Sequence, residues 1–175
     1  MAIRPVRTYG DPVLRLKAAA VEEPLELLKG LVDDMFETMF DEPGIGLAAP
    51  QVGVSKRLVV IAPVADDDEG ENIGARLVLV NPEITWFSEE RVPYEEGCLS
   101  VPEITEVVER PRAIQFAYTD LDGVRREHDA AGLLARVVQH ELDHLDGVLF
   151  VDRLSLIKKQ LLRKRLKQLA DAARS

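Results

Sequence analysis

The chain of 175 residues is 46% hydrophobic and 30% charged, which is typical of a globular enzyme or binding module with one substantial core. Its formal net charge is −9, but residues 153–175 carry +7 and the rest −16, so we expect only the basic carboxy-terminal segment to meet an anionic partner. No signal-peptide layout or bilayer-length apolar run is present, and the single cysteine, Cys98, excludes an intrachain disulfide, which together predict a cytoplasmic location.

The first third of the chain is predicted to contain an arm, a helix and a glycine-rich run. Residues 1–22 are expected to form an extended, ordered arm because prolines and a glycine interrupt them. A helix is predicted over 24–40, where apolar residues recur every three or four positions. From Gly44 to Gly53 small residues alternate with apolar ones around a single polar side chain, Gln51. Such a run lets a ligand approach the backbone, although a tight turn entering a strand is an equal alternative.

The middle of the chain is predicted to form antiparallel strands. Residues rich in β-branched and leucine side chains, or alternating apolar with polar ones, lie at 57–62, 76–80, 83–87, 104–109, 113–119 and 124–128. Asn81-Pro82 is expected to separate the second of these strands from the third, and Asp120 to Gly123 to form a hairpin turn. The acidic residues 65–72 are expected to form a surface loop.

A central helix is predicted over about 130–145, with Asp129 as its cap and Gly147 ending it. At about 100° per residue, one side of this helix carries Leu133, Val137, His140, Glu141 and His144. The opposite side carries Arg136, Gln139, Asp143 and Asp146. We therefore predict that the helix is buried along most of its length and directs its histidines inward.

Two histidines four apart on a helix can reach one metal ion, with the intervening glutamate free to handle a proton. His140 and His144 have this spacing around Glu141, and Cys98 completes a His₂Cys set. Three protein ligands leave a fourth position for water, which is typical of a catalytic metal site. A buried, inert cysteine and a nucleophilic Cys-His pair are the alternative interpretations.

A last helix is predicted over 155–173, where leucines lie among the basic residues. No repeat or linker divides the chain, so residues 1–175 are expected to form a single domain. The predicted fold class is α+β, with antiparallel β-sheets packed around the central metal-binding helix and with an N-terminal and a C-terminal helix.

Three stretches resemble the bacterial peptide deformylases in order and spacing. They are Gly44-Ile45-Gly46-Leu47-Ala48-Ala49-Pro50-Gln51, Glu96-Gly97-Cys98-Leu99-Ser100 and Gln139-His140-Glu141-Leu142-Asp143-His144. The resemblance covers essentially the whole chain, including the opening from Arg7 to Leu14 and the carboxy-terminal helix. It implies a metal-dependent hydrolase that removes the formyl group from the N-terminal formyl-methionine of newly made proteins and releases formate.

The resemblance also implies roles for individual residues. Cys98, His140 and His144 hold the metal, and hydroxide formed there attacks the formyl carbon, with Glu141 as general base and then general acid. The Gln51 amide and the Leu99 backbone N–H stabilise the oxyanion.

The substrate-binding residues implied by the resemblance lie on both sides of the site. The run at Ile45 and Gly46, together with Gly97, lies beside an extended peptide, and Leu133 and Val137 line the methionine pocket. One departure concerns the peptide beyond its first residue, because Thr105 stands where some members have an arginine.

The implied metal is Fe²⁺, one ion per chain, although Zn²⁺, Ni²⁺ or Co²⁺ could occupy a purified sample and the spacing of the ligands does not discriminate. The implied partners are N-formyl-methionyl nascent peptides and, through the basic helix, ribosomal RNA. For that helix, a solvated face packed by its leucines is the alternative. For the whole protein, the alternatives are a zinc peptidase and a non-catalytic metal-binding or ribosome-associated module.

Overall fold

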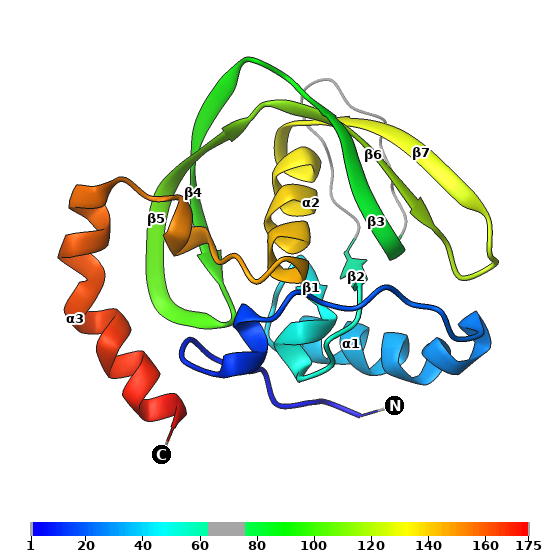
Figure 1. Cartoon of the computed structure of the whole chain (residues 1–175), viewed down its shortest axis with the longest axis horizontal. Helices are drawn as coiled ribbons and strands as arrows, with labels where there is room; N and C mark the ends of the chain where they lie inside the picture. Colours follow the sequence, from blue (N-terminus) through cyan, green and yellow to red (C-terminus); the bar gives the residue numbers. More distant parts are fainter. Residues whose placement is uncertain (1, 63–75, 175) are drawn as a thin grey trace.

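The computed structural model describes residues 2–62 and 76–174, so the predicted acidic loop at 65–72 lies outside the described residues. Its strands form a five-stranded antiparallel sheet in the order β1-β2-β3-β6-β7 and a separate hairpin of β4 and β5 (Figure 1). The strands are β1 Gly46–Ala48, β2 Leu58–Ile61, β3 Leu77–Phe87, β4 Arg91–Cys98, β5 Val101–Pro111, β6 Ala113–Thr119 and β7 Arg125–Ala131. Together with the helices they confirm the predicted α+β class.

The helix α2 (Gly132–Leu145) runs through the middle of the molecule, between the larger sheet and the β4–β5 hairpin (Figure 1). The amino-terminal helix α1 (Lys29–Asp41) lies below it, and α3 (Leu156–Ala173) lies outside the hairpin (Figure 1). Short 3-10 turns connect these elements: η1 Pro12–Arg15, η2 Leu25–Leu28, η3 Ala49–Val52 and η4 Phe150–Arg153. No helix among the described residues is long and apolar enough to cross a membrane.

The buried apolar side chains form three clusters, which divide the molecule around α2. One joins the aliphatic side chains of α2 to β2, β3 and β6, and a second joins α1 to β1, η3 and β2. The third joins β5 to η4 and α3, through residues such as Val108 and Leu162. The β4–β5 hairpin and α2 therefore belong to different apolar clusters, and the contacts between them are largely polar.

The strand predictions were right in position but wrong in two details. Residues 77–87 form one strand rather than two, because Asn81 adopts a left-handed backbone (φ 49°) and a bulge between Val80 and Glu83 absorbs the proline. The residues before Cys98 were not predicted as a strand, yet β4 pairs with β5 along its length.

Two of the three predicted helix starts were wrong in detail. The first helix begins with the 3-10 turn η2 before α1. Asp129 does not cap α2, since it lies in β7 opposite Gln115. The chain instead turns directly from β7 into α2 at Gly132, whose φ of 62° favours glycine.

The side of α2 opposite the histidines, which carries Arg136 and Gln139, is also covered. Arg136 is 6% exposed and Gln139 4% exposed, because the β4–β5 hairpin covers this side of α2. Gln139 donates to the Pro111 carbonyl of β5 at 2.9 Å. Helical periodicity identified the polar side of α2 but could not show that a second sheet lies on it.

Candidate metal centre

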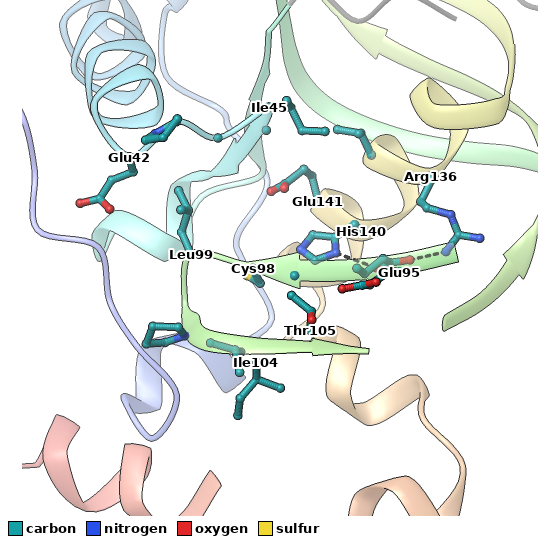
Figure 2. A pocket seen from close by; sticks show the side chains of 18 of the residues that line it. Glu42, Ile45, Glu95, Cys98, Leu99, Ile104, Thr105, Arg136, His140 and Glu141 are labelled. Atoms are coloured by element: carbon teal, nitrogen blue, oxygen red, sulfur yellow. Dashed lines mark hydrogen bonds and ion pairs between the residues drawn. The ribbon is translucent and has the colours of Figure 1, made fainter. Parts of the chain in front are cut away.

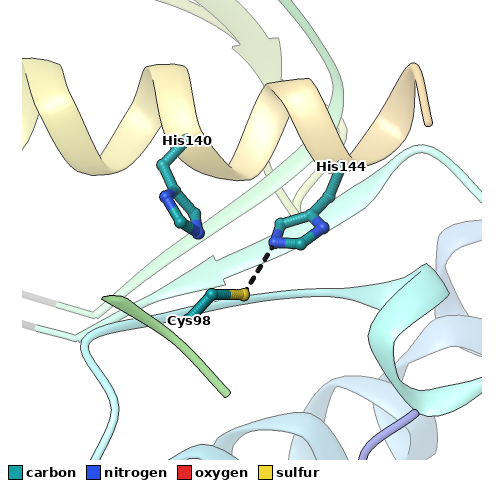
Figure 3. Close-up of side chains that lie close together, drawn as sticks. All are labelled: Cys98, His140 and His144. Atoms are coloured by element: carbon teal, nitrogen blue, oxygen red, sulfur yellow. Dashed lines mark hydrogen bonds between the residues drawn. The ribbon is translucent and has the colours of Figure 1, made fainter. Parts of the chain in front are cut away.

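Cys98, His140 and His144 meet at the junction of the hairpin with α2. Cys98 ends β4, and the two histidines lie one helical turn apart on α2, with their rings directed at the thiol (Figure 3). Their potential ligand atoms all lie within 4.8 Å of one another. The structure thus brings together the three residues that the spacing of the sequence selected.

The geometry and chemistry of this group fit a divalent metal ion. A cysteine sulfur and a histidine nitrogen bound to one tetrahedral ion lie roughly 3.5 Å apart, and Cys98 Sγ lies 3.3 Å from His144 Nε2. Burial, together with the charge of His140, lowers the pKa of His144 well below its ordinary value, which favours the neutral imidazole that binds metals. His144 Nδ1 is buried, and no described residue forms a hydrogen bond with it.

A carboxylate that the sequence analysis did not select orients His140. Glu96 Oε1 lies 2.9 Å from His140 Nδ1, which leaves Nε2 of the ring for a metal. Glu96 also accepts two hydrogen bonds from Arg110, at 2.6 and 3.0 Å. Burial raises the pKa of Glu96, but the hydrogen bonds from His140 and Arg110 outweigh it and lower this pKa to about 2. Glu96 stands two residues before Cys98, a spacing that puts both side chains on one strand face and could have identified it.

His140 contacts Glu96 and Cys98. Burial lowers the pKa of His140, but these contacts outweigh burial and raise the pKa well above its ordinary value.

Glu141 lies beside the three candidate ligands and is almost completely buried, at 5% exposure. Its buried Oε2 atom has no hydrogen-bond partner among the described residues, so the bonding capacity of this oxygen is unused there. Burial raises the pKa of Glu141 to about 7, although the charges of His140 and Arg110 act to lower it. This value is close to the pKa that suits a general base near neutral pH.

The carboxylate of Glu141 packs directly on Gly46 of β1. A Cβ atom at Gly46 would lie 2.9 Å from Glu141 Oε1 and 3.0 Å from its Cγ. A side chain at this position would therefore displace Glu141.

Gln51 and Leu99 also lie at the cavity. Gln51 is 1% exposed, and its Oε1 accepts from the Ala48 N–H at 2.9 Å. Its Nε2 lies 3.6 Å from Cys98 Sγ and 3.1 Å from Ser100 Oγ. This anchoring of the carbonyl directs the amide nitrogen toward the candidate ligands.

These groups line one cavity of about 570 Å³ (Figure 2). His144 is buried and does not line this cavity. The other candidate site residues from the sequence all line it: Ile45, Gly46, Gln51, Gly97, Cys98, Leu99, Leu133, Val137, His140 and Glu141. Thr105 lies opposite Gly97 in the hairpin and lines the same cavity. The exposed acids Glu42, Glu95 and Glu103 also line the cavity, and its described lining residues include no exposed arginine.

Comparison with known proteins identifies one family. The sequence profile described as "Polypeptide deformylase" matches residues 3–160. The peptide deformylase of Bradyrhizobium diazoefficiens is 46% identical over 173 residues, which cover 99% of this chain and 99% of that protein.

Solved structures that share this fold include other peptide deformylases. The peptide deformylase of Legionella pneumophila superposes with a TM-score of 0.84 at 44% identity, covering 95% of each chain. A class I type b peptide deformylase from Acinetobacter baumannii with Met-Ala-Ser bound superposes with a TM-score of 0.80 at 40% identity, covering 87% of this chain and 99% of that one.

Proposed function

The chain belongs to the peptide deformylase family and is therefore a hydrolase that removes an N-terminal formyl group; from that premise we propose its substrate and mechanism. The substrate is the formyl-methionine that begins newly made proteins, and the products are formate and the methionyl peptide. One observation carries the proposal: Glu141 lies beside the group formed by Cys98, His140 and His144, on the wall of a cavity that can admit a peptide.

The three ligands and Glu141 divide the chemistry between them. Cys98, His140 and His144 would hold a divalent ion, and such an ion would lower the pKa of water so that hydroxide is available near neutral pH. Glu141 accepts the proton of the attacking water and then donates it to the amine nitrogen as the formyl C–N bond breaks. Its pKa of about 7 supports both roles, because such a group gains and loses a proton readily near neutral pH.

Gln51 and Leu99 stabilise the oxyanion that develops on the formyl oxygen. The Gln51 amide nitrogen and the Leu99 backbone N–H donate to it, and both residues line the cavity next to Cys98. Loss of one such donor typically raises the barrier by roughly 3–4 kcal/mol.

The peptide lies between the two strands that border the cavity. Ile45 and Gly46 on one side and Gly97 on the other offer backbone groups to an extended chain, and Leu133 and Val137 of α2 line the methionine pocket. The related Acinetobacter baumannii structure with Met-Ala-Ser bound supports a peptide as the ligand.

We propose Fe²⁺ as the physiological ion, with Zn²⁺, Ni²⁺ or Co²⁺ as occupants of a purified sample. The thiolate and imidazole donors suit all four ions. Metal analysis of protein purified without oxygen tests this assignment, and zinc as the dominant metal under those conditions would contradict it.

Replacement of Glu141 tests the mechanism. Wild type should release formate from formyl-Met-Ala-Ser, and Glu141→Gln should retain its metal but react about 10²- to 10⁴-fold more slowly, because it lacks the general base. Glu89→Gln, at an exposed position, is the matched control and should react at the wild-type rate.

Two outcomes would favour other functions. Cleavage of unformylated peptides without formate release would indicate a peptidase. Absence of turnover with every loaded metal would indicate a binding module.

We further propose that the basic face of α3 docks on ribosomal RNA in the cytoplasm, near the substrate's origin. Lys159, Arg163, Lys164 and Lys167 are exposed, whereas Lys158 and Arg165 bond to carbonyl groups of β5. Because Leu162 of α3 is buried in the third apolar cluster, deletion of the helix would also disturb the fold.

Substitution of the four exposed residues is therefore the better test. Changing all four to glutamine should weaken sedimentation with ribosomes at least tenfold at low salt and leave turnover of formyl-Met-Ala-Ser unchanged. Wild-type ribosome affinity in this variant would contradict the docking proposal.

A further inference from the structure

Arg136 is a buried cation that the proposed reaction does not use. It stands one helical turn before His140 on α2 and is 6% exposed. A buried charge is costly unless it is paired and hydrogen-bonded. The groups that bond to Arg136 should therefore indicate why a charge is buried at this position.

Each partner of Arg136 belongs to the β4–β5 hairpin. Nη1 donates to Glu96 Oε2 and to the Val108 carbonyl, the latter at 3.0 Å. Nη2 donates to the Val92 carbonyl at 2.7 Å. The guanidinium also lies over the Tyr94 ring, 5.4 Å from its centre. One side chain of α2 thus bonds to both strands of the hairpin and to its buried carboxylate.

These contacts bear on the metal centre because its ligands come from both sides of the same junction. Cys98 ends the hairpin strand that carries Glu96, whereas His140 lies on α2. Glu96 accepts from Arg136 on one oxygen and contacts His140 on the other. Because the helix and the hairpin belong to different apolar clusters, this polar contact helps to set their separation, together with the bonds of Gln139 to Pro111 and of Arg110 to Asp143.

Arg110 contacts Glu96 without joining it to the helix. It lies on β5 and therefore holds Glu96 from within the hairpin, while a separate bond at 2.9 Å joins it to Asp143 of α2. Among the described contacts of Glu96, only those of Arg136 and His140 come from the helix.

We propose that Arg136 is a positioning residue: its contacts with Glu96, Val92 and Val108 hold the hairpin and α2 at the separation at which Cys98, His140 and His144 converge on one ion. The inference rests on the proposed metal centre. It assigns Arg136 no contact with the substrate or with the ion.

Cobalt binding tests this role without relying on turnover. Arg136→Met removes the guanidinium but keeps an apolar chain, and Arg136→Lys keeps the charge but cannot make all three bonds. Arg153→Met is the control, because Arg153 bonds to Asp143 of the same helix and not to Glu96. Each protein is loaded with Co²⁺, and its dissociation constant, its visible absorption spectrum and its unfolding midpoint are measured.

Both Arg136 variants should bind Co²⁺ about 10- to 100-fold more weakly than wild type, with altered thiolate-to-cobalt and d–d bands. The control should stay within about twofold. Wild-type affinity and spectrum in folded Arg136→Met would overturn the inference, as would an equal loss in the control. Failure of both Arg136 variants to fold would also overturn it, by showing a requirement for folding instead.

The outcome is independent of the proposed reaction. A wild-type protein that binds Co²⁺ through this site but releases no formate would refute the proposed function. The positioning role of Arg136 would still be decided by the cobalt measurements.

Discussion

At the scale of single residues, the site depends on close contact between the Glu141 side chain and Gly46, which has no side chain. Glu141 rests on Gly46, so the carboxylate is held by backbone on one side and by its own helix on the other. A polar group buried in this way has a raised pKa and little freedom to move. Gly46 therefore contributes to the chemistry by its size.

Gly46→Ala should reduce kcat/KM about 10- to 100-fold, because a small displacement of a catalytic group has an effect of this order. The added Cβ would lie 2.9 Å from Glu141 Oε1. Steady-state assays of formate release measure the effect. Gly30→Ala is the control, since no described atom beyond the neighbouring backbone of its own helix lies within 4 Å of its Cβ position. It should keep full activity and stabilise α1 by about 0.5–1 kcal/mol. Wild-type kcat/KM in Gly46→Ala would contradict the prediction.

At the scale of elements, the hairpin, α2 and α3 form successive layers across the molecule. The third apolar cluster lies between β5 and α3, and Leu162 is the fully buried leucine of α3. Leu156, Ile157 and Leu161 of the same helix are exposed at 70–76%. Although leucines recur along the whole helix, only the side that includes Leu162 packs against the rest of the protein and stabilises it.

Leu162→Ala should lower the free energy of unfolding by about 2–4 kcal/mol, through lost apolar contact and the cavity left behind. Leu161→Ala makes the same chemical change one residue earlier, at 76% exposure, and should alter stability by less than about 0.5 kcal/mol. Urea unfolding of both variants measures the difference. Equal effects would show that α3 does not pack on β5 in solution.

At the scale of the whole molecule, two apolar clusters meet across a layer of charged groups. Arg110 and Arg136 converge on Glu96, and Arg110 and Arg153 converge on Asp143. The lowered pKa of Glu96 shows that the neighbouring charged groups favour its ionised carboxylate over the protonated form. Acid should therefore weaken the layer.

In metal-free protein, the stabilisation from Glu96 should be fully present above its unfolded pKa of about 4.5 and be lost as the pH falls through its folded pKa of about 2. Such a shift corresponds to about 3 kcal/mol. The free energies of unfolding of wild type and Glu96→Gln should differ most above pH 4.5 and converge below it, as measured by urea unfolding across this range.

Glu95→Gln serves as the control, because Glu95 is the exposed neighbour of Glu96. It should stay within about 0.5 kcal/mol of wild type at each pH. A difference between wild type and Glu96→Gln that persists unchanged at low pH would contradict the prediction.

Local pattern by itself determined the helix periods, most of the strands and the choice of His140, Glu141, His144 and Cys98 as a possible metal site. These features depend on residue spacing and on side-chain chemistry, both of which can be read along the chain. The α+β class followed from them, as did the expectation of a buried central helix.

Only the tertiary structure decided which segments cover each face of α2. Helical periodicity put Arg136 and Gln139 on the side opposite the histidines, and no pattern gave Glu96 a role, whereas all three are buried where α2 meets the hairpin. The sequence analysis also divided β3 at Asn81, where cross-strand pairing with β6 continues the strand around a bulge. The physical reason is that periodicity reports which residues share a face, while burial and charge pairing depend on segments distant in the chain that meet only on folding.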